Sequence, residues 1–216
     1  MMEYLDLSSC GKQAALGTQL ASLHLHNKRL QVVARYLFIS ICQNQGTEDY
    51  VDRFGFDTET CCGFLPQGNA WMGDWADFYT EKLDEQIRRK RDGELETLWA
   101  KLRPLLPDLF SGIEIFPSLL HGDLWGGNVG QVGSEPVIFD PASFYGHHEY
   151  DLGIAAMFGG FTSAFYSGYH KIIPKSPGFD KRNQLYQLFH YLNHWNHFGG
   201  GYRSQALEIM RSLLHC

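Results

Sequence analysis

The run HGDLWGGN, from His121 to Asn128, combines residue types that suit phosphoryl transfer. That reaction needs a carboxylate beside the attacking hydroxyl group and oxygen ligands that hold magnesium on the phosphates. Asp123 is placed to accept the hydrogen of a substrate hydroxyl, and Asn128 can turn its amide oxygen toward a metal ion at the end of a tight loop. The intervening glycines let the backbone turn sharply and approach phosphates closely.

A second carboxylate, Asp140, follows the apolar run 137–139, which is preceded by the turn residues 133–136. This pattern predicts a hairpin whose second arm delivers Asp140 toward the HGDLWGGN loop. A single His-Gly-Asp triplet would be weak, because short motifs recur by chance. The full set is more specific: an apolar strand into HGD, Asn128 after Asp123, and a hairpin that ends in Phe-Asp-Pro.

This arrangement resembles the catalytic core of kinase-like phosphotransferases of the aminoglycoside and choline kinase type. The downstream stretches DPASFYGHHEYDLGIAAMFGGF, IPKSPGFDKR and LYQLFHYLNHWNHFG are similar to the fructosamine kinase family. The resemblance covers most of residues 1–30 and nearly all of residues 50–214. It implies an α+β, mainly helical fold, namely the C-terminal lobe of a protein-kinase-like fold with a short catalytic-loop hairpin.

The resemblance also implies a reaction. Family members use ATP and Mg²⁺ to phosphorylate the 3-hydroxyl of ketosamines (ribulosamine, psicosamine or fructosamine) on glycated proteins or small molecules, which leads to deglycation. Carried onto this chain, Asp123 matches the proton acceptor, and Asn128 and Asp140 match the magnesium ligands. The hinge whose backbone meets the adenine corresponds to Glu3, Tyr4 and Leu5.

The chain departs from the family pattern near its start. Residues 1–7 resemble a hinge remnant, residues 8–216 resemble the C-terminal lobe, and an atypical segment covers residues 31–50. No glycine-rich strand-turn-strand precedes the hinge, and the first lysine, Lys12, already lies on the expected opening helix. In such kinases a glycine-rich loop and a strand lysine of the N-terminal lobe hold the ATP phosphates. Because the sequence contains neither, we expect that the N-terminal lobe is absent and that the 216-residue form is weakly active or inactive.

Other functions remain open at this stage. The chain could be a non-catalytic fragment with the fold of the large lobe, or a kinase for choline- or aminoglycoside-type substrates. A metallophosphoesterase fits less well, because Asn128 is followed by Val129 rather than by histidine. No Asp-x-His lies upstream to complete a two-metal site.

Helices are expected to position the catalytic loop. Residues 12–27 predict an amphipathic helix with Ser8 or Ser9 as its N-cap. Residues 43–70 predict an irregular connection, and residues 74–106 predict two helices separated at Asp92-Gly93. After Pro141 the helical period returns in the segments 149–160, 161–170, 180–198 and 204–214.

Several further side chains have two interpretations. His121 is expected to fix the turn of the catalytic loop rather than to act in catalysis. Glu149 and Asp151 could anchor that loop, or they could be acids stabilised by a helix N-terminus. Trp195 could form a wall of the substrate pocket, although a buried aromatic residue is the more common case.

Histidines and cysteines offer little sign of a metal site in the sequence. The histidines of the 180–198 segment (His190, His194 and His197) alternate with aromatic residues, and no cysteine or carboxylate lies nearby in sequence to complete a zinc shell. We therefore expect them on a core or pocket face. Cys61 and Cys62 are interpreted as two buried thiols.

The composition is that of a globular protein, with 44% hydrophobic and 19% charged residues. The net charge of −6 is spread along the chain without a basic block, which disfavours nucleic-acid binding. Five cysteines without zinc-type or disulfide-type spacing indicate reduced thiols and a cytosolic protein. The segment 32–42 is too short to span a membrane and contains Arg35, and the acidic start lacks the features of a secretory signal.

Overall fold

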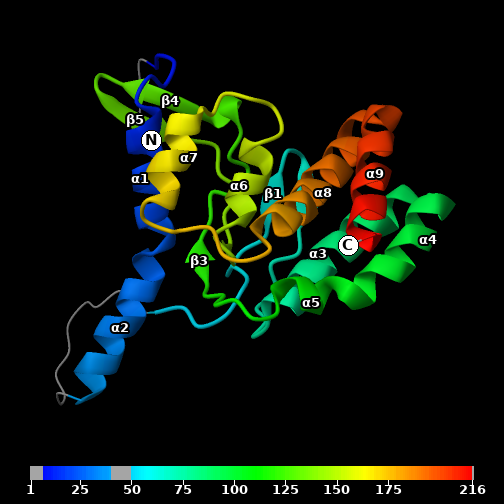
Figure 1. The fold of residues 1–216 in the computed structure, drawn as a ribbon, viewed down its shortest axis with the longest axis horizontal. Helices are drawn as coiled ribbons and strands as arrows, with labels where there is room; N and C mark the ends of the chain where they lie inside the picture. Colours follow the sequence, from blue (N-terminus) through cyan, green and yellow to red (C-terminus); the bar gives the residue numbers. More distant parts are fainter. Residues whose placement is uncertain (1–6, 40–49, 216) are drawn as a thin grey trace.

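The computed structural model describes residues 7–39 and 50–215, and it is mainly helical with three two-stranded antiparallel sheets in these residues (Figure 1). The predicted α+β, mainly helical class is confirmed. The helices are α1 (Gln13–His24), α2 (His26–Ile39), α3 (Trp75–Lys90), α4 (Gly93–Leu102), α5 (Leu106–Phe110), α6 (Tyr150–Ala155), α7 (Ser163–His170), α8 (Phe179–Phe198) and α9 (Arg203–Leu214). Short 3₁₀ turns are η1 (Arg103–Leu105), η2 (Gly126–Asn128) and η3 (Gly200–Tyr202).

The three sheets are short. They pair β1 (Thr60–Cys62) with β2 (Leu65–Gln67), β3 (Ser118–Leu119) with β6 (Tyr145–Gly146), and β4 (Val129–Val132) with β5 (Glu135–Ile138). The β4–β5 register aligns Val129 with Ile138, which confirms the predicted hairpin after the HGDLWGGN loop. These strands serve to place loops rather than to form a sheet core.

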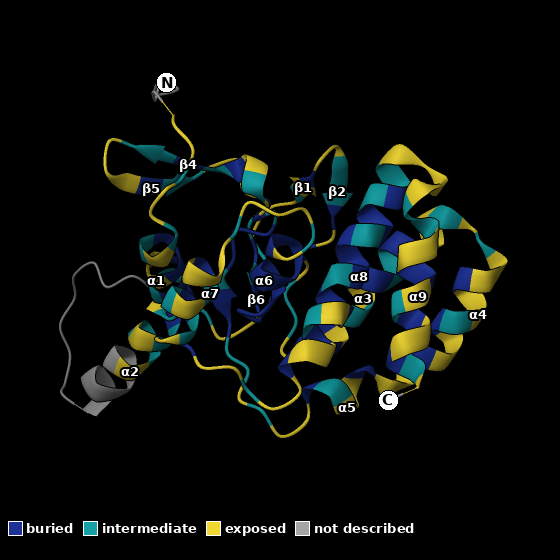
Figure 2. Ribbon diagram, turned by 45° about the horizontal axis from the view of Figure 1, so that its top comes forward, coloured by how far each residue is buried: buried dark blue, intermediate teal, exposed yellow. Residues whose placement is uncertain are grey.

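Two groups of buried apolar side chains hold the helices together. The buried positions of the helices are dark blue in Figure 2. The larger group lies among α3, α4, α8 and α9 and includes Tyr79, Leu95, Phe189 and Met210. The smaller group joins α1, α6 and α7. The long helix α8 contacts α9, which belongs to the larger group, and α6, which belongs to the smaller group. It therefore connects the two groups.

Helices α1 and α7 pack unusually closely, side by side in Figure 1. A Cβ atom at Gly17 would lie 2.1 Å from the carbonyl oxygen of Phe165, and one at Gly168 would lie 2.3 Å from that of Ala14. Both distances are far below van der Waals contact. Glycine at these two positions therefore allows the helix backbones to touch and brings the C-terminal end of α1, with His24, beneath the catalytic loop.

Capping residues set the ends of α3 and α4. The side chain of Asp74 accepts a hydrogen bond from the backbone N–H of Asp77 at the start of α3. Arg91 ends that helix in a left-handed conformation, and Asp92 then caps α4 by accepting from two backbone N–H groups. The predicted break at Asp92-Gly93 is confirmed.

Three expectations about local structure are wrong. Ser8 does not cap α1: it forms a β-bridge with Gln131, and the N-cap residue Lys12 makes no side-chain cap. The expected irregular connection contains the β1–β2 hairpin. Cys61 is exposed while Cys62 is buried, because neighbouring residues of a strand point to opposite faces.

The atypical segment 31–50 lies partly outside the described residues. Helix α2 continues to Ile39 and extends away from the rest of the molecule in Figure 1. Residues 40–49 are not described. In the part of the chain that the structure describes, no helix combines the length and apolar character needed to cross a membrane.

Candidate active site

The backbone of the HGD segment is held in a sharp turn by its neighbours. The N–H of Leu120 donates to the carbonyl of Phe144, and the N–H of Ala142 donates to the carbonyl of His121. Between these bonds Gly122 adopts a φ of 84°, and a Cβ there would lie 2.1 Å from the carbonyl oxygen of Ala142. Only glycine meets both conditions. The turn directs the next residue, Asp123, out of the buried strand.

A buried carboxylate fixes this turn from below. Asp151, in the first turn of α6, accepts hydrogen bonds from the backbone N–H groups of His121 and Gly122, each at 2.8 Å. Its Oδ2 also lies 3.1 Å from Nε2 of His24 in α1. Burial favours a higher pKa for Asp151, but the hydrogen bond and charge of His24, the nearby His121 and the backbone N–H of Gly122 together lower it below its usual value. Of the two interpretations of Asp151, the loop anchor is confirmed.

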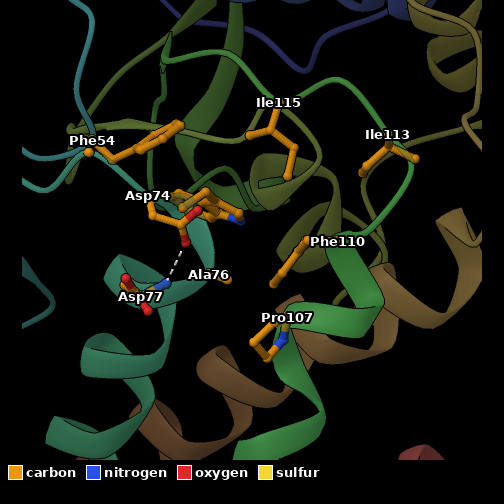
Figure 3. Close-up of a pocket in the computed structure, with 10 residues that line it drawn as sticks. Phe54, Asp74, Ala76, Asp77, Pro107, Phe110, Ile113 and Ile115 are labelled. Atoms are coloured by element: carbon orange, nitrogen blue, oxygen red, sulfur yellow. Dashed lines mark hydrogen bonds between the residues drawn. The ribbon is translucent and has the colours of Figure 1, made fainter.

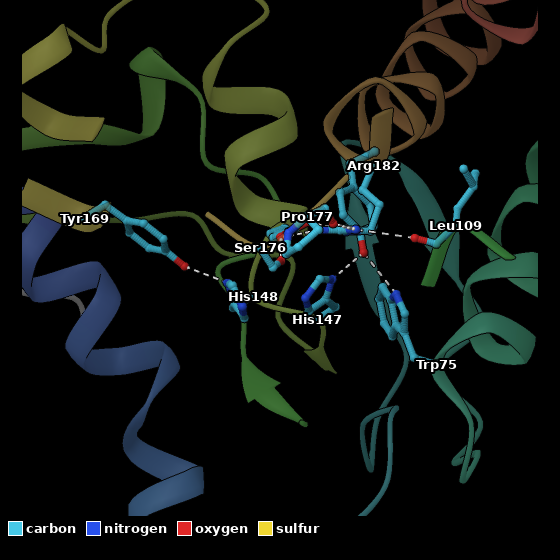
Figure 4. Close-up of polar contacts among 10 residues, drawn as sticks. Trp75, Leu109, His147, His148, Tyr169, Ser176, Pro177 and Arg182 are labelled. Carbon is cyan, nitrogen blue, oxygen red and sulfur yellow. Dashed lines mark hydrogen bonds and ion pairs between the residues drawn. The ribbon is translucent and has the colours of Figure 1, made fainter. Parts of the chain in front are cut away.

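Glu149, the other candidate anchor, has a different partner. It forms a buried two-pronged ion pair with Arg182 of α8, at 2.7 and 2.9 Å, and accepts a hydrogen bond from Ser176. Arg182 also donates to the carbonyls of Pro177 and Leu109 (Figure 4). Glu149 therefore joins α8 and α5 to the segment before α6 and does not touch the catalytic loop directly.

His121 has the structural role that we expected. Its Nε2 donates to the carbonyl oxygen of Phe139 at 2.9 Å, and its Nδ1 accepts from the backbone N–H of Asp123 at 3.3 Å. The ring thus bridges the catalytic loop and the end of the β4–β5 hairpin. Both ring nitrogens therefore have a hydrogen-bond partner.

Asn128 joins the two carboxylate residues that the sequence singles out. Its Nδ2 donates to the carbonyl oxygen of Asp123 at 2.9 Å, lies 3.4 Å from the Asp123 carboxylate, and lies 3.5 Å from the carbonyl of Asp140. Asp140 itself has a φ of 56°, an unusual value for a residue other than glycine. The structure therefore brings Asp123, Asn128 and Asp140 together.

The same geometry leaves oxygen ligands for a hard cation. Because the amide nitrogen of Asn128 makes the contacts within the loop, its amide oxygen is the atom that can face a metal ion. The carboxylate of the exposed Asp140 lies on the same turn. An amide oxygen and a carboxylate are ligands that magnesium accepts. Asn128 and Asp140 therefore fit the magnesium ion that a kinase-like fold implies.

Asp123 is half-buried and electrostatically perturbed. Burial raises its pKa above the usual value, and the negative charge of Asp140 acts in the same direction. Nearby histidines, His121 and His194, and a hydrogen bond from the thiol of Cys62 act in the opposite direction. A carboxylate with a raised pKa is a stronger proton acceptor, which suits a general base.

The Asp123 side chain opens into a small cavity of 170 Å³. Its walls come from the β1–β2 hairpin, the catalytic loop and the end of α8, and consist of Cys62, Gly63, Asp123, Trp125, Asn193, His194, His197 and Phe198. The sequence alone did not predict Cys62 or Asn193 here. Trp195 is a buried aromatic residue of the core and does not form a wall of this cavity. The tryptophan that lines the cavity is the exposed Trp125 of the HGDLWGGN motif.

A second hollow lies at the start of α3 and shares no residue with the first (Figure 3). It is lined mainly by apolar side chains such as Phe54, Phe110 and Ile115. Its carboxylate Asp74 is the N-cap of α3. None of the predicted catalytic residues lines it, so the cavity at Asp123 is the candidate active site.

The expected adenine-binding residues, Glu3, Tyr4 and Leu5, lie outside the described residues. Their role stays a prediction.

The described residues have a mainly helical, kinase-like fold, in which Asn128 brings the loop of Asp123 and the hairpin of Asp140 together. The sequence profile of the fructosamine kinase family matches residues 1–216, and this chain belongs to that family.

The chain is 55% identical to ketosamine-3-kinase of Mus musculus, covering 99% of this chain and 72% of the mouse protein. It is 40% identical to the chloroplastic protein-ribulosamine 3-kinase of Arabidopsis thaliana and spans 61% of that protein's length. Two bacterial crystal structures, of proteins proposed as fructosamine-3-kinases, share the fold at 27% identity. The Thermobifida fusca structure has a TM-score of 0.76 and is covered over 69% of its length, and the Haemophilus somnus structure has a TM-score of 0.75 and is covered over 67%.

Proposed function

We propose that this chain carries the base and metal-binding part of an ATP-dependent kinase for the 3-hydroxyl of ketosamines. The substrates would be ribulosamine, psicosamine and fructosamine groups on glycated proteins or on small molecules. The kinase names of the relatives support this substrate class. The observation that carries the proposal is the contact of Asn128 with both Asp123 and Asp140, because phosphoryl transfer needs these groups in one place.

Each residue of the loop has a distinct task in this proposal. Asp123 accepts the hydrogen of the attacking 3-hydroxyl as the oxygen approaches the γ-phosphate. Asn128 and Asp140 would hold Mg²⁺, which would neutralise charge on the phosphates of ATP. Asp151 keeps the loop backbone in position through two N–H groups. The hinge residues Glu3, Tyr4 and Leu5 would meet the adenine.

The biological result would be deglycation, because a 3-phosphate destabilises the ketosamine adduct and frees the amine. We further propose a cytosolic location. The free thiols Cys10, Cys61 and Cys62 among the described residues support a reducing compartment.

The test is phosphorylation of a ribulosyl-lysine peptide by the purified chain with Mg-ATP, followed by mass spectrometry. We expect Asp123→Asn to lower the rate by about 10² to 10⁴, the usual contribution of a general base. Asp180→Asn is a matched control, because Asp180 is an exposed acid at the start of α8. If the control variant phosphorylates the peptide at a measurable rate, an equal rate for Asp123→Asn would contradict the role of Asp123.

The 216 residues span 72% and 61% of the mouse and Arabidopsis relatives. The weak activity expected of these residues alone stays a prediction.

Two results would favour the other functions. Absence of any melting-temperature rise with Mg-ATP would favour a non-catalytic fragment. Faster phosphorylation of choline or an aminoglycoside than of the ketosamine peptide would favour a different substrate class.

A further inference from the structure

His190, in the middle of α8, is fully buried, and neither of its ring nitrogens has a hydrogen-bond partner among the described residues. Buried polar groups nearly always have a partner, so an exception needs a physical explanation, such as a bound ion, a water molecule, strain or a role in chemistry. Aromatic rings surround part of the imidazole, with Tyr150 at 5.1 Å and Phe189 at 5.2 Å between ring centroids. The proposed phosphoryl transfer does not use this side chain.

Two other ligand types face His190 from separate segments. Cys62 comes from β1 and Asp123 from the catalytic loop, and one ligand atom from each of the three residues lies within 4.8 Å of the others. The thiol of Cys62 is buried, donates a hydrogen bond to the Asp123 carboxylate and accepts one from Nδ2 of Asn193 at 3.2 Å. Cys62 and Asp123 also line the active-site cavity, so an ion has a route to this cluster.

We propose that Cys62, Asp123 and His190 form a zinc site, and that zinc bound there switches off phosphoryl transfer. Thiolate, imidazole and carboxylate are the ligands that zinc prefers, whereas magnesium selects oxygen ligands. Asn128 and Asp140, which offer oxygen ligands, would therefore select magnesium. The cluster of Cys62, Asp123 and His190, which offers sulfur, oxygen and nitrogen, would select zinc.

The geometry and charge are suitable. Zinc–ligand bonds of about 2.0 to 2.3 Å in a tetrahedron place ligand atoms about 3.3 to 3.8 Å apart, so a side-chain movement on the order of 1 Å closes the site. Water from the cavity fills the fourth position. Binding forms a sulfur–zinc bond, and the thiol proton of Cys62 leaves to solvent. One thiolate and one carboxylate then balance the two positive charges of the ion.

Another grouping of metal-ligating types, His147, His148 and Glu149, does not have open ligands in the same way. Arg182 already engages both carboxylate oxygens of Glu149. Each histidine ring bonds a tyrosine hydroxyl through Nδ1, His147 to Tyr186 and His148 to Tyr169. The cluster around His190 is distinguished by an imidazole with two unpartnered nitrogens.

Inhibition follows because Asp123 belongs to both sites. Zinc bound to one oxygen of Asp123 withdraws electron density from the carboxylate, which makes it a much weaker acceptor for the hydrogen of the substrate hydroxyl. This part of the inference rests on the proposed kinase function, whereas zinc binding itself does not.

Metal binding by the full 216-residue chain tests the site directly. We expect one zinc ion per chain in competition with a chromogenic chelator, and a thiolate-to-metal charge-transfer band when Co²⁺ replaces zinc. Cys62→Ser should remove that band, and Cys62→Ser and His190→Gln should each weaken zinc binding by at least about 100-fold, since even second-shell partners contribute 10- to 100-fold. Cys61→Ser is the matched control, because the neighbouring thiol of Cys61 is exposed. This substitution should leave the zinc affinity and the cobalt band unchanged.

Specific results would overturn the proposal. Absence of the cobalt band in the wild-type chain excludes a thiolate ligand without the need for a variant. Wild-type zinc affinity in a folded Cys62→Ser chain would do the same. If the cobalt band is present but zinc leaves the phosphorylation rate unchanged, the inhibitory role is wrong. If zinc binds and no ketosamine is phosphorylated with or without it, the kinase function fails while the metal site stands.

Discussion

At the scale of single residues, the position of the HGDLWGGN loop depends on the carboxylate of Asp151, which does not line the cavity at Asp123. Asp151 is fully buried and accepts hydrogen bonds from two loop N–H groups and from His24. Each acceptor oxygen is therefore used. A buried N–H group that loses its acceptor costs about 1 to 3 kcal/mol, so this residue couples the stability of the molecule to the position of Asp123.

We expect Asp151→Asn to lower the free energy of unfolding by about 1 to 3 kcal/mol, because its amide nitrogen cannot accept the bond that one carboxylate oxygen now accepts. We also expect kcat to fall more than KM rises, because Asp123 shifts while the cavity walls stay. Urea unfolding and steady-state kinetics measure the two effects. The exposed Asp180→Asn should change stability by less than about 0.5 kcal/mol. An equal effect of both substitutions would contradict the anchoring role.

At the scale of elements, α8 connects the segment before α6 with the cavity at Asp123. Its first turn carries Arg182, which pairs with Glu149 just before α6, and its last turns carry His194 and His197 to the cavity. Lys82 of α3 packs on the other side of the β1–β2 hairpin and donates to Gln67 and Asn69. Buried polar contacts, and not only apolar packing, thus set the position of these elements.

The Arg182–Glu149 pair gives a stability prediction for α8. Arg182→Met should lower the free energy of unfolding by about 3 to 5 kcal/mol, because it leaves the buried Glu149 charge without its partner. The double variant Arg182→Met with Glu149→Leu should recover at least half of that loss, which urea unfolding would show. The exposed pair of Lys175 and Asp180 is the control, and Lys175→Met should cost less than about 1 kcal/mol. No recovery in the double variant would argue against an unpaired charge as the cause.

Lys82 gives a pH-dependent prediction for the packing of α3. Burial lowers the pKa of Lys82 to about 7, against about 10.4 in an unfolded chain. Between these values the unfolded state binds the extra proton, so the contribution of Lys82 to stability rises with pH in this window. The stability difference between wild type and Lys82→Met should change by up to about 1.4 kcal/mol per pH unit from about pH 7 to pH 9. A difference that is constant with pH would show that Lys82 stays charged.

At the scale of the whole molecule, a buried polar layer crosses the centre of the lobe (Figure 4). The hydroxyl of Tyr186 accepts from Nε1 of Trp75 and donates to Nδ1 of His147, while Tyr169 contacts His148. Burial lowers the pKa of both histidines, for His148 to about 3. These rings are therefore neutral in the folded protein and would take up protons on unfolding.

Acid should destabilise the whole lobe for this reason. An unfolded histidine has a pKa of about 6.5, so the unfolded state binds more protons as the pH falls from 6.5 toward 3, and stability declines in that window. At pH 5 His148 should contribute a loss of about 2 kcal/mol relative to pH above 7, and His147 should contribute a loss in the same direction. The loss of stability between pH 7 and pH 5, measured by urea unfolding, should be smaller in His148→Gln by about 2 kcal/mol, whereas the exposed His215→Gln should leave it unchanged. The same decline in both variants would contradict this account.

Local sequence patterns predicted much of the fold. The break between α3 and α4 and the β4–β5 hairpin follow from residues close together in the chain. The N-cap of α1 was wrong, because a bridge to the distant Gln131 holds Ser8. Propensity describes what a segment can form alone, and it carries no information about a partner strand far along the chain.

For the candidate site, the sequence by itself determined the core of Asp123, Asn128 and Asp140. A glycine-containing loop and a short hairpin join them, so their spacing alone brings them together. Only the tertiary structure decided that Asp151 anchors the loop and that Cys62 and His190 meet Asp123. These residues lie on separate elements, and the packing of α6, α8 and the β1–β2 hairpin sets their distances, which no local spacing encodes.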